Sequence, residues 1–188
     1  YGQILELLSH RRYGMLKSEC QSSLKLSDGT FSRAVEELVR CGYIVEYKRN
    51  YDKGNPKYLQ LIDAFLLFHY HFLSKDSDTV SYTELTHREG FFSNWRGNAF
   101  EIMCIQHIDQ IKTALGILGV RTRSYPWTGA SDEAGAQIDL VIERDDRITD
   151  LCEMKCTDKP FVISKEYEEK LLQKREVFQK ATGTKQVL

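Results

Sequence analysis

Two short apolar runs joined by a polar turn constrain the fold of this chain more than any other feature. Residues 137–142 and 151–156 both alternate polar with apolar side chains, and such period-two alternation is typical of β-strands. The connection between them is short and contains Asp145 and Asp146, residues that favour a turn. The two runs therefore predict an antiparallel hairpin.

The pairing within this hairpin predicts a chemical site. If the hairpin is symmetric about Asp146, Asp139 lies directly across from Glu153, and Gln137 lies across from Lys155. Directly opposed side chains have Cβ atoms about 5 Å apart, and two carboxylates at that distance must protonate or share a cation. Carboxylate oxygens suit Mg²⁺, and a lysine beside them can orient or activate a water molecule. These are the components of metal-assisted phosphodiester hydrolysis.

The same spacing also fits an ordinary salt-bridged hairpin, in which Lys155 neutralises Asp139 and Glu153 without any metal. A slip of one residue in the register would move every side chain to the opposite face. The spacing alone leaves both interpretations open.

Composition excludes some classes of protein and leaves others open. The chain of 188 residues has a net charge of −1, with ten basic and seven acidic side chains in residues 1–60 and 16 against 20 in the remainder. This asymmetry permits nucleic-acid contact by the first part without requiring it. We see no signal peptide and no apolar run long enough to cross a membrane, and the odd number of cysteines, five, favours reduced thiols in the cytoplasm. The chain starts at Tyr1 within a helical pattern, so we expect a fragment of a longer protein.

The first 62 residues follow the pattern of a winged helix-turn-helix. Helical spacing occurs in residues 1–9, weakly in residues 17–24, and clearly after an N-cap at Ser27, with Gly42 as the left-handed residue at the end. Two strands follow, at residues 43–47 and 57–61, with a turn cluster between them.

A winged helix often places its third helix in the major groove of DNA. The basic residues that we expect to contact nucleic acid are Arg33 on that helix and three residues of the wing, Lys48, Arg49 and Lys53. Glu36 and Glu37 on the same helix would repel phosphate. A winged helix that packs against protein is therefore the alternative interpretation.

The middle of the chain predicts two helices and a linker. Asp63 caps an apolar and aromatic helix over residues 64–73, which we expect to be buried on all sides. Residues 74–94 are polar and irregular and are predicted to form a linker. A long helix over residues 96–118 follows, ended by Gly119. It carries Glu101, either as a helix-dipole partner or as a third acid of the metal site.

The remaining segments surround the hairpin. We expect a strand at residues 120–125, a loop at residues 126–135 that contains Trp127, a charged helix that begins after Ser164, and an apolar strand from residue 184. Trp127 either stacks on a base or packs in the core, and packing is the favoured interpretation.

The order helix, strand, strand, strand, helix, strand over residues 95–188, with Asp139 and Glu153-Met154-Lys155 on the central hairpin, resembles the restriction-endonuclease-like fold of the PD-(D/E)XK nucleases. The resemblance implies an α/β domain with a mixed central sheet. It also implies that Asp139 and Glu153 bind Mg²⁺ or Mn²⁺, that Glu101 joins them, and that Lys155 serves the attacking water.

A longer series of motifs, residues 54–63, Gly97-Asn98-Ala99-Phe100-Glu101, Ile138-Asp139-Leu140-Val141 and Glu153-Met154-Lys155, resembles the C-terminal half of prokaryotic AAA-type ATPases, the archaeal or DEXX-box ATPase group. The resemblance implies a winged helix (1–62), an aromatic helix and linker (63–94) and a nuclease-like domain (95–188). Where this chain has Gln137, members of the group often carry an acidic residue.

The implied partners are DNA, a further copy of the chain and an N-terminal ATPase domain. The sequence contains no phosphate-binding P-loop of its own, so ATP would act only through that domain. Three functions follow as hypotheses. The first is a metal-dependent deoxyribonuclease domain joined to a winged helix. The second is a non-catalytic DNA- or protein-binding scaffold of the ATPase. The third is a regulator that acts through the winged helix alone.

Overall fold

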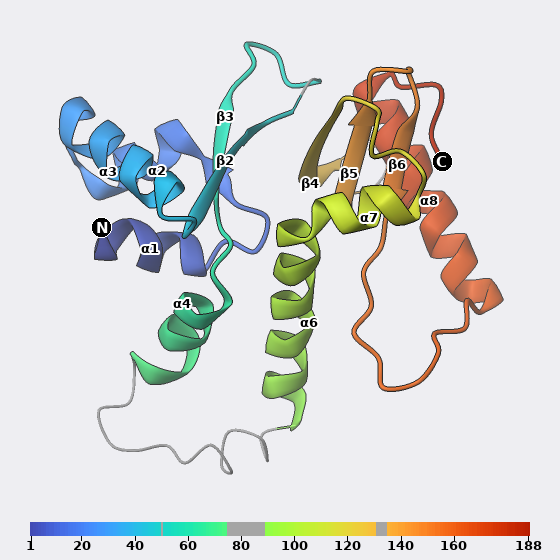
Figure 1. The fold of residues 1–188 in the computed structure, drawn as a ribbon, viewed down its shortest axis with the longest axis horizontal. Helices are drawn as coiled ribbons and strands as arrows, with labels where there is room; N and C mark the ends of the chain where they lie inside the picture. The colour runs from blue at the N-terminus through green and yellow to red at the C-terminus, as the bar shows by residue number, and fades with distance from the viewer. Residues whose placement is uncertain (50, 75–88, 131–134) are drawn as a thin grey trace. The chain divides into compact units, whose positions relative to one another are not determined.

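The computed structural model describes residues 1–49, 51–74, 89–130 and 135–188 (Figure 1). The chain divides into two compact units, Tyr1–Gln106 and His107–Leu188. It is a mixed α/β protein, and each unit contains a small three-stranded antiparallel sheet. Within the described ranges, no helix is both long enough and apolar enough to cross a membrane.

The first unit is built from helices packed on a small sheet. Its sheet has the strand order β1-β3-β2, and the short strand β1 was not predicted. Its elements are, in chain order, α1 (Gly2–Ser9), β1 (Met15–Leu16), α2 (Lys17–Leu24), α3 (Asp28–Arg40), β2 (Ile44–Lys48), β3 (Lys57–Leu61), α4 (Ala64–Phe68), a π-helix (His69–Leu73) and α6 (Glu89–Gln106).

Helix α3 forms where its capping residues and apolar spacing predicted it. The Ser27 side chain accepts a hydrogen bond from the Thr30 amide, and Gly42 follows the helix with a φ of 77°. Phe31, Val35 and Leu38 face inward and are almost fully buried, in one cluster with residues of α1, α2 and β3. Local sequence therefore defines both the ends and the buried side of this helix.

The apolar helix after Asp63 is not buried on all sides, and this part of the prediction was wrong. Leu67 and Phe72 are buried, but Phe65 is 69% exposed and Leu73 is 44% exposed. A helix at the edge of a small unit can bury only one side, here the side of Phe72, whose ring meets the edge of Trp95 at 5.7 Å between centroids. The predicted cap is confirmed, since Asp63 accepts a hydrogen bond from the Leu66 amide.

The single long helix predicted over residues 96–118 is two helices. Helix α6 ends at Gln106, and α7 (Ile108–Ala114) begins after His107, whose φ of −105° and ψ of 32° are not helical. Gly116, with a φ of 71°, follows α7 and takes the terminating place predicted for Gly119.

The first unit extends further along the chain than the predicted domain boundaries at residues 62 and 95. Helix α6 already includes residues 89–94, which were predicted as linker, while residues 75–88 of that linker lie outside the described residues. Trp95 on α6 packs against Phe68 and Phe72, and Ile102 belongs to the core cluster of this unit. Side-chain packing therefore draws residues 95–106 into the first unit.

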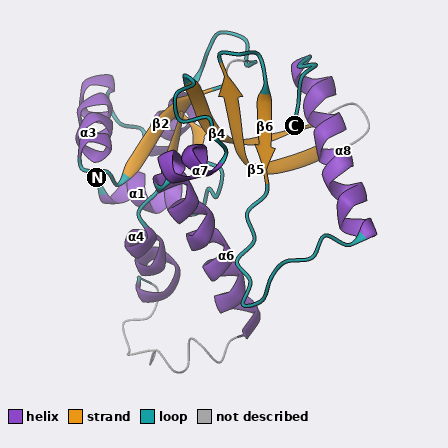
Figure 2. Cartoon of the chain, turned by 45° about the vertical axis from the view of Figure 1, so that its right-hand side comes forward, coloured by secondary structure: helices purple, strands orange, loops and turns teal. Residues whose placement is uncertain are grey.

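The second unit is a hairpin sheet with a helix beside it. Helix α8 contacts β4 and β5 and lies along the sheet (Figures 1 and 2). Thr149 also forms a parallel bridge with Val187, so the last residues add a short parallel pairing to an otherwise antiparallel sheet. After α7 the elements are β4 (Thr122–Ala130), β5 (Gly135–Arg144), β6 (Thr149–Cys152) and α8 (Lys165–Thr182), with the strand order β4-β5-β6.

Strand β4 is longer than predicted, because residues 126–130 continue the ladder with β5 instead of forming a loop. Residues 131–134 of the predicted loop lie outside the described residues. Trp127 is 4% exposed, and its ring meets Phe178 of α8 edge-on at 5.1 Å between centroids. The favoured interpretation of Trp127 as a packing residue is confirmed, and its indole explains why β4 remains attached to the core.

Candidate functional site

The hairpin pairs in the register that its symmetry predicted. Strands β5 and β6 match Leu140 with Cys152 and Val141 with Leu151, and the remaining pairs keep Asp146 at the centre. The ladder ends at Leu140 and Cys152, so Asp139 and Glu153 lie one step beyond the last pair. The predicted strand over residues 151–156 therefore stops at Cys152, and only its first part is correct.

Asp139 itself accounts for the early end of the ladder. Asp139 is 5% exposed, and its Oδ2 accepts a hydrogen bond from the Met154 amide at 3.0 Å. That amide is thus satisfied by a side chain in place of a strand partner. On its other side, β5 meets an irregular step in the register between Tyr125 and Trp127, where Pro126 has no amide hydrogen to donate. Asp139 therefore lies at a break in the sheet, with its carboxylate hydrogen-bonded to the Met154 amide.

Glu153 lies among three hydrogen-bond donors. Its Oε2 accepts from Lys155 Nζ at 3.1 Å and from the Tyr167 hydroxyl at 3.2 Å, and its Oε1 accepts from Lys174. Burial alone would raise the pKa of this carboxyl, but the hydrogen bonds and charges of Lys174 and Lys155 outweigh burial and lower the pKa. Glu153 is therefore ionised at neutral pH.

Lys155 is held as a cation by the same group. Partial burial would lower its pKa, but its interactions with Tyr167 and Glu153 prevail and raise it. Its ammonium also lies 5.6 Å from the centre of the Tyr167 ring. The predicted proximity of Lys155 to Glu153 is present in the structure, and Lys155 remains half-exposed to solvent.

Lys174 and Tyr167 belong to this site and were not predicted as members of it. Both lie on α8, which was predicted only as a charged helix. Tyr167, Leu171 and Lys174 follow the spacing i, i+4 and i+7, so all three lie on one side of the helix. This spacing could have identified Lys174 as a residue on the same side of the helix as the apolar residues Tyr167 and Leu171.

Glu101 occupies a different environment in the first unit. It is 7% exposed, and both its carboxylate oxygens bind the guanidinium of Arg12, with Arg12 Nε to Oε2 at 2.9 Å. Among the described residues, no three His, Cys, Asp or Glu side chains form a group that could hold a metal ion. Of the predicted acids, Asp139 and Glu153 belong to the hairpin, where Asp139 accepts a hydrogen bond from the amide of Met154, the residue after Glu153.

The predicted basic wing of the first unit is smaller than the sequence suggests. Arg49 is 6% exposed, because its guanidinium lies on the ring of Tyr58 at 4.1 Å, so it does not have the exposure expected of a phosphate contact. Lys57 binds Glu46 on the neighbouring strand at 2.6 Å. Lys48 and Lys53 remain exposed.

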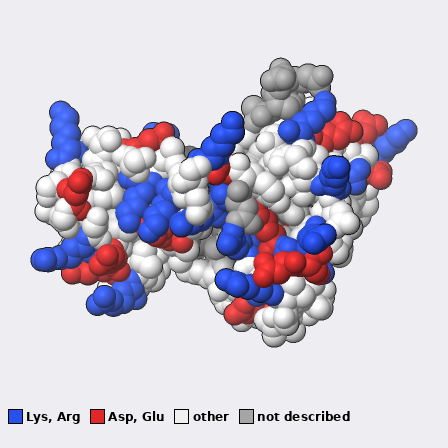
Figure 3. All heavy atoms as spheres, turned by 90° about the horizontal axis from the view of Figure 1, so that it is seen from above, with Lys and Arg blue, Asp and Glu red and all other residues white. Residues whose placement is uncertain are grey.

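Arg33 on α3 is also exposed. Figure 3 shows Lys and Arg side chains gathered on the face of the first unit that it draws, with acidic side chains among them. The exposed residues Arg33, Lys48 and Lys53 are thus the remaining cations of the predicted nucleic-acid surface.

Comparison of the chain with protein-family models, with curated protein sequences and with solved structures found no match.

Proposed function

We propose that this chain is a DNA-acting module, in which a winged helix over residues 1–62 is joined to a metal-dependent nuclease-like domain of the PD-(D/E)XK type. Three helices followed by a two-stranded hairpin support the first assignment. The hairpin with Asp139 and Glu153-Met154-Lys155, preceded by β4 and followed by α8, supports the second. The resemblance to archaeal ATPases supports the proposal that the module belongs to the C-terminal region of such an ATPase.

The observation that carries this proposal is the register of β5 and β6. It brings the Asp139 carboxylate to the backbone immediately after Glu153, and Lys155 follows within hydrogen-bond distance of Glu153. Two acids and a lysine at these positions are the elements of metal-assisted phosphodiester hydrolysis.

The donor set of these residues fits Mg²⁺ or Mn²⁺. Mg²⁺ is commonly held by one or two carboxylates, while water and substrate phosphate complete its coordination. Asp139 and Glu153 would hold the ion, and the neighbouring lysines keep Glu153 in the ionised form that binds cations. Glu101 is not included, because both its oxygens bind Arg12.

Each residue of the site would have a defined role. A bound metal would supply stabilisation of the negative charge on phosphate and a lowered pKa for a coordinated water. Lys155 would donate a hydrogen bond to a phosphate oxygen or to the attacking water. The Met154 amide orients Asp139, while Lys174 and Tyr167 orient Glu153.

A non-catalytic scaffold is the second candidate function, and the environment of Glu153 favours it. Lys155, Lys174 and Tyr167 already satisfy this carboxylate without a metal. The acidic balance of residues 61–188 also weakens attraction to phosphate. In this case the hairpin acids would be structural.

Calorimetry with Mn²⁺ separates the two functions. We expect the parent chain to bind Mn²⁺, and Asp139→Ala and Glu153→Ala to weaken binding by roughly tenfold or more. Asp145→Ala is the matched control, because it removes an exposed carboxylate from the turn of the same hairpin. Lys155→Met should keep Mn²⁺ binding and lower DNA cleavage by roughly a hundredfold or more.

Absence of Mn²⁺ binding to the parent at millimolar concentration would overturn the nuclease proposal in favour of the scaffold. Binding that Asp145→Ala weakens as much as Asp139→Ala would mean that the metal binds loosely to the acidic surface.

A further inference from the structure

A cavity of about 610 Å³ opens beside Glu153 and Lys155 in the second unit. Its volume lies within the range of pockets that bind small molecules. Its wall combines an apolar floor from the sheet and α8 with a charged rim. The apolar side chains that line it include Ile138, Leu151, Phe161, Ile163, Leu171 and Leu172.

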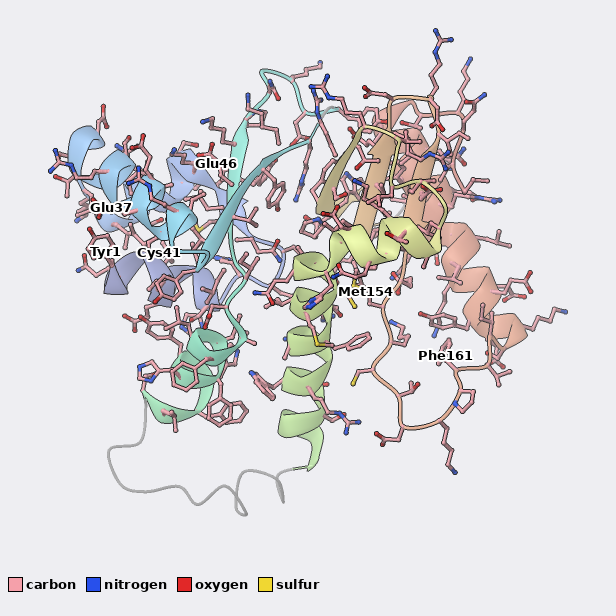
Figure 4. All side chains as sticks on the ribbon, in the orientation of Figure 1. Tyr1, Glu37, Cys41, Glu46, Met154 and Phe161 are labelled. Atoms are coloured by element: carbon pink, nitrogen blue, oxygen red, sulfur yellow. The ribbon has the colours of Figure 1, made fainter. Side chains whose placement is uncertain are left out.

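The segment between β6 and α8 presents an aromatic ring at this cavity. Phe161 is 47% exposed, and its ring meets Tyr167 edge-on at 5.1 Å between centroids, while Val162 is 81% exposed (Figure 4). A large exposed apolar surface at the mouth of a pocket is typical of a binding site. Without a ligand, burying such a surface would stabilise the folded protein.

Cations predominate at the rim of the cavity. Lys155, Lys174 and Arg175 face two acids, Glu153 and Glu168. Both lysines contact Glu153, whereas Arg175 forms no ion pair among the residues that the structure describes. The rim therefore favours a ligand with an anionic group, and the floor favours an apolar part of that ligand.

We propose that this cavity binds an unpaired nucleotide of single-stranded DNA, with its base against Phe161 and its phosphate at Lys155 and Arg175. This inference rests on the proposed function and specifies its substrate class. Bases in a duplex are covered on both faces by their neighbours, so only an unpaired or extruded base can enter a pocket. Stacking on an exposed aromatic ring together with cations along the backbone is the general mode of single-strand binding.

Fluorescence anisotropy with a labelled oligothymidylate, and with a duplex of equal length, tests this inference in the presence of EDTA. We expect the full chain to bind the single strand more tightly than the duplex. Phe161→Ala should weaken single-strand binding by roughly tenfold. Phe161→Tyr should restore most of it, because tyrosine keeps a ring for stacking.

Phe65→Ala is the matched control, since Phe65 is an exposed phenylalanine of the first unit and its loss should leave single-strand binding unchanged. Arg175→Gln should weaken single-strand binding and make it less sensitive to salt. Phe161→Ala should bind Mn²⁺ as the parent does, which also reports that the second unit is folded.

Equal single-strand affinity of the parent and Phe161→Ala would overturn the inference, and so would a parent that prefers the duplex. If either of these outcomes is found and the parent still binds Mn²⁺, only the proposed substrate class is wrong. If it binds neither Mn²⁺ nor DNA, the proposed function fails as well.

Discussion

Glu101 in the first unit and Glu153 in the second are both shielded glutamates with basic partners, yet their surroundings differ in kind. Glu101 is bound on both oxygens by the guanidinium of Arg12. Glu153 is shared by two lysines and a tyrosine from two segments of the chain, at the edge of an open cavity.

The difference indicates which acid can take part in chemistry. A bidentate arginine pair fixes geometry and leaves little for another ligand to gain. A lysine is a compact charge on a flexible stem, so a divalent cation that binds Glu153 can displace it at lower cost. The pair of Arg12 and Glu101 is thus suited to holding α6 to the loop after α1. The cluster around Glu153 is suited to exchanging a lysine for a metal ion.

The largest expected effects test whether the two units are independent. Phe31 and Phe178 are each almost fully buried, one in each unit. Phe31→Ala and Phe178→Ala should each destabilise their own unit by about 3–5 kcal/mol through lost burial and cavity formation. Urea unfolding followed by tryptophan fluorescence measures this, because Trp95 belongs to the first unit and Trp127 to the second.

Trp95→Phe and Trp127→Phe backgrounds assign each signal to one unit. If Phe178→Ala shifted the Trp95 transition as far as the Trp127 transition, the two units would unfold as one. Glu101 and Glu153 would then belong to the same cooperative structure.

A smaller effect is expected from Glu101→Ala, which removes the carboxylate that the Arg12 guanidinium binds. The expected destabilisation of the first unit is about 1–2 kcal/mol, since the arginine side chain is 43% exposed and water compensates part of the loss. Glu36→Ala, at an exposed position on α3, should change stability by less than about 0.5 kcal/mol. Mn²⁺ affinity should not change, and weaker Mn²⁺ binding by Glu101→Ala would make Glu101 a metal ligand after all.

The smallest effect concerns acid stability of the second unit. The folded chain lowers the pKa of Glu153 below its usual value of 4.5, so the ionised form is favoured in the folded state. Its contribution to stability is complete above the unfolded pKa and is lost as the pH falls through the folded pKa. Urea midpoints measured from neutral pH to below pH 4.5 should decline less steeply for Glu153→Gln than for the parent. Parallel declines would mean that other groups control acid unfolding.

Local sequence predicted much of the fold for physical reasons that act over a few residues. Ser27 and Asp63 cap helices because their oxygens lie within reach of nearby amides, and Gly42 ends α3 because it accepts a positive φ. The turn around Asp146 sets the hairpin register, which agrees with the predicted register as far as the pair of Leu140 and Cys152.

Errors arose where packing at long range competes with local pattern. The helical pattern of the sequence continues through His107, but the helix is interrupted at that residue. Residues 126–130 carry turn-forming types, yet burial of Trp127 against Phe178 keeps them in β4. An apolar helix can be recognised from its residues, whereas the side that remains exposed depends on its neighbours.

By itself the sequence determined the capped helices, the hairpins β2–β3 and β5–β6 and the acids of the second hairpin, because each depends on spacing along a few residues. Only the tertiary structure decided which cations from distant parts of the chain Glu101 and Glu153 meet. Arg12 and Glu101 are far apart in the chain, and so are Lys174 and Glu153. Partners at such separations are selected by the packing of whole elements, which no local pattern encodes.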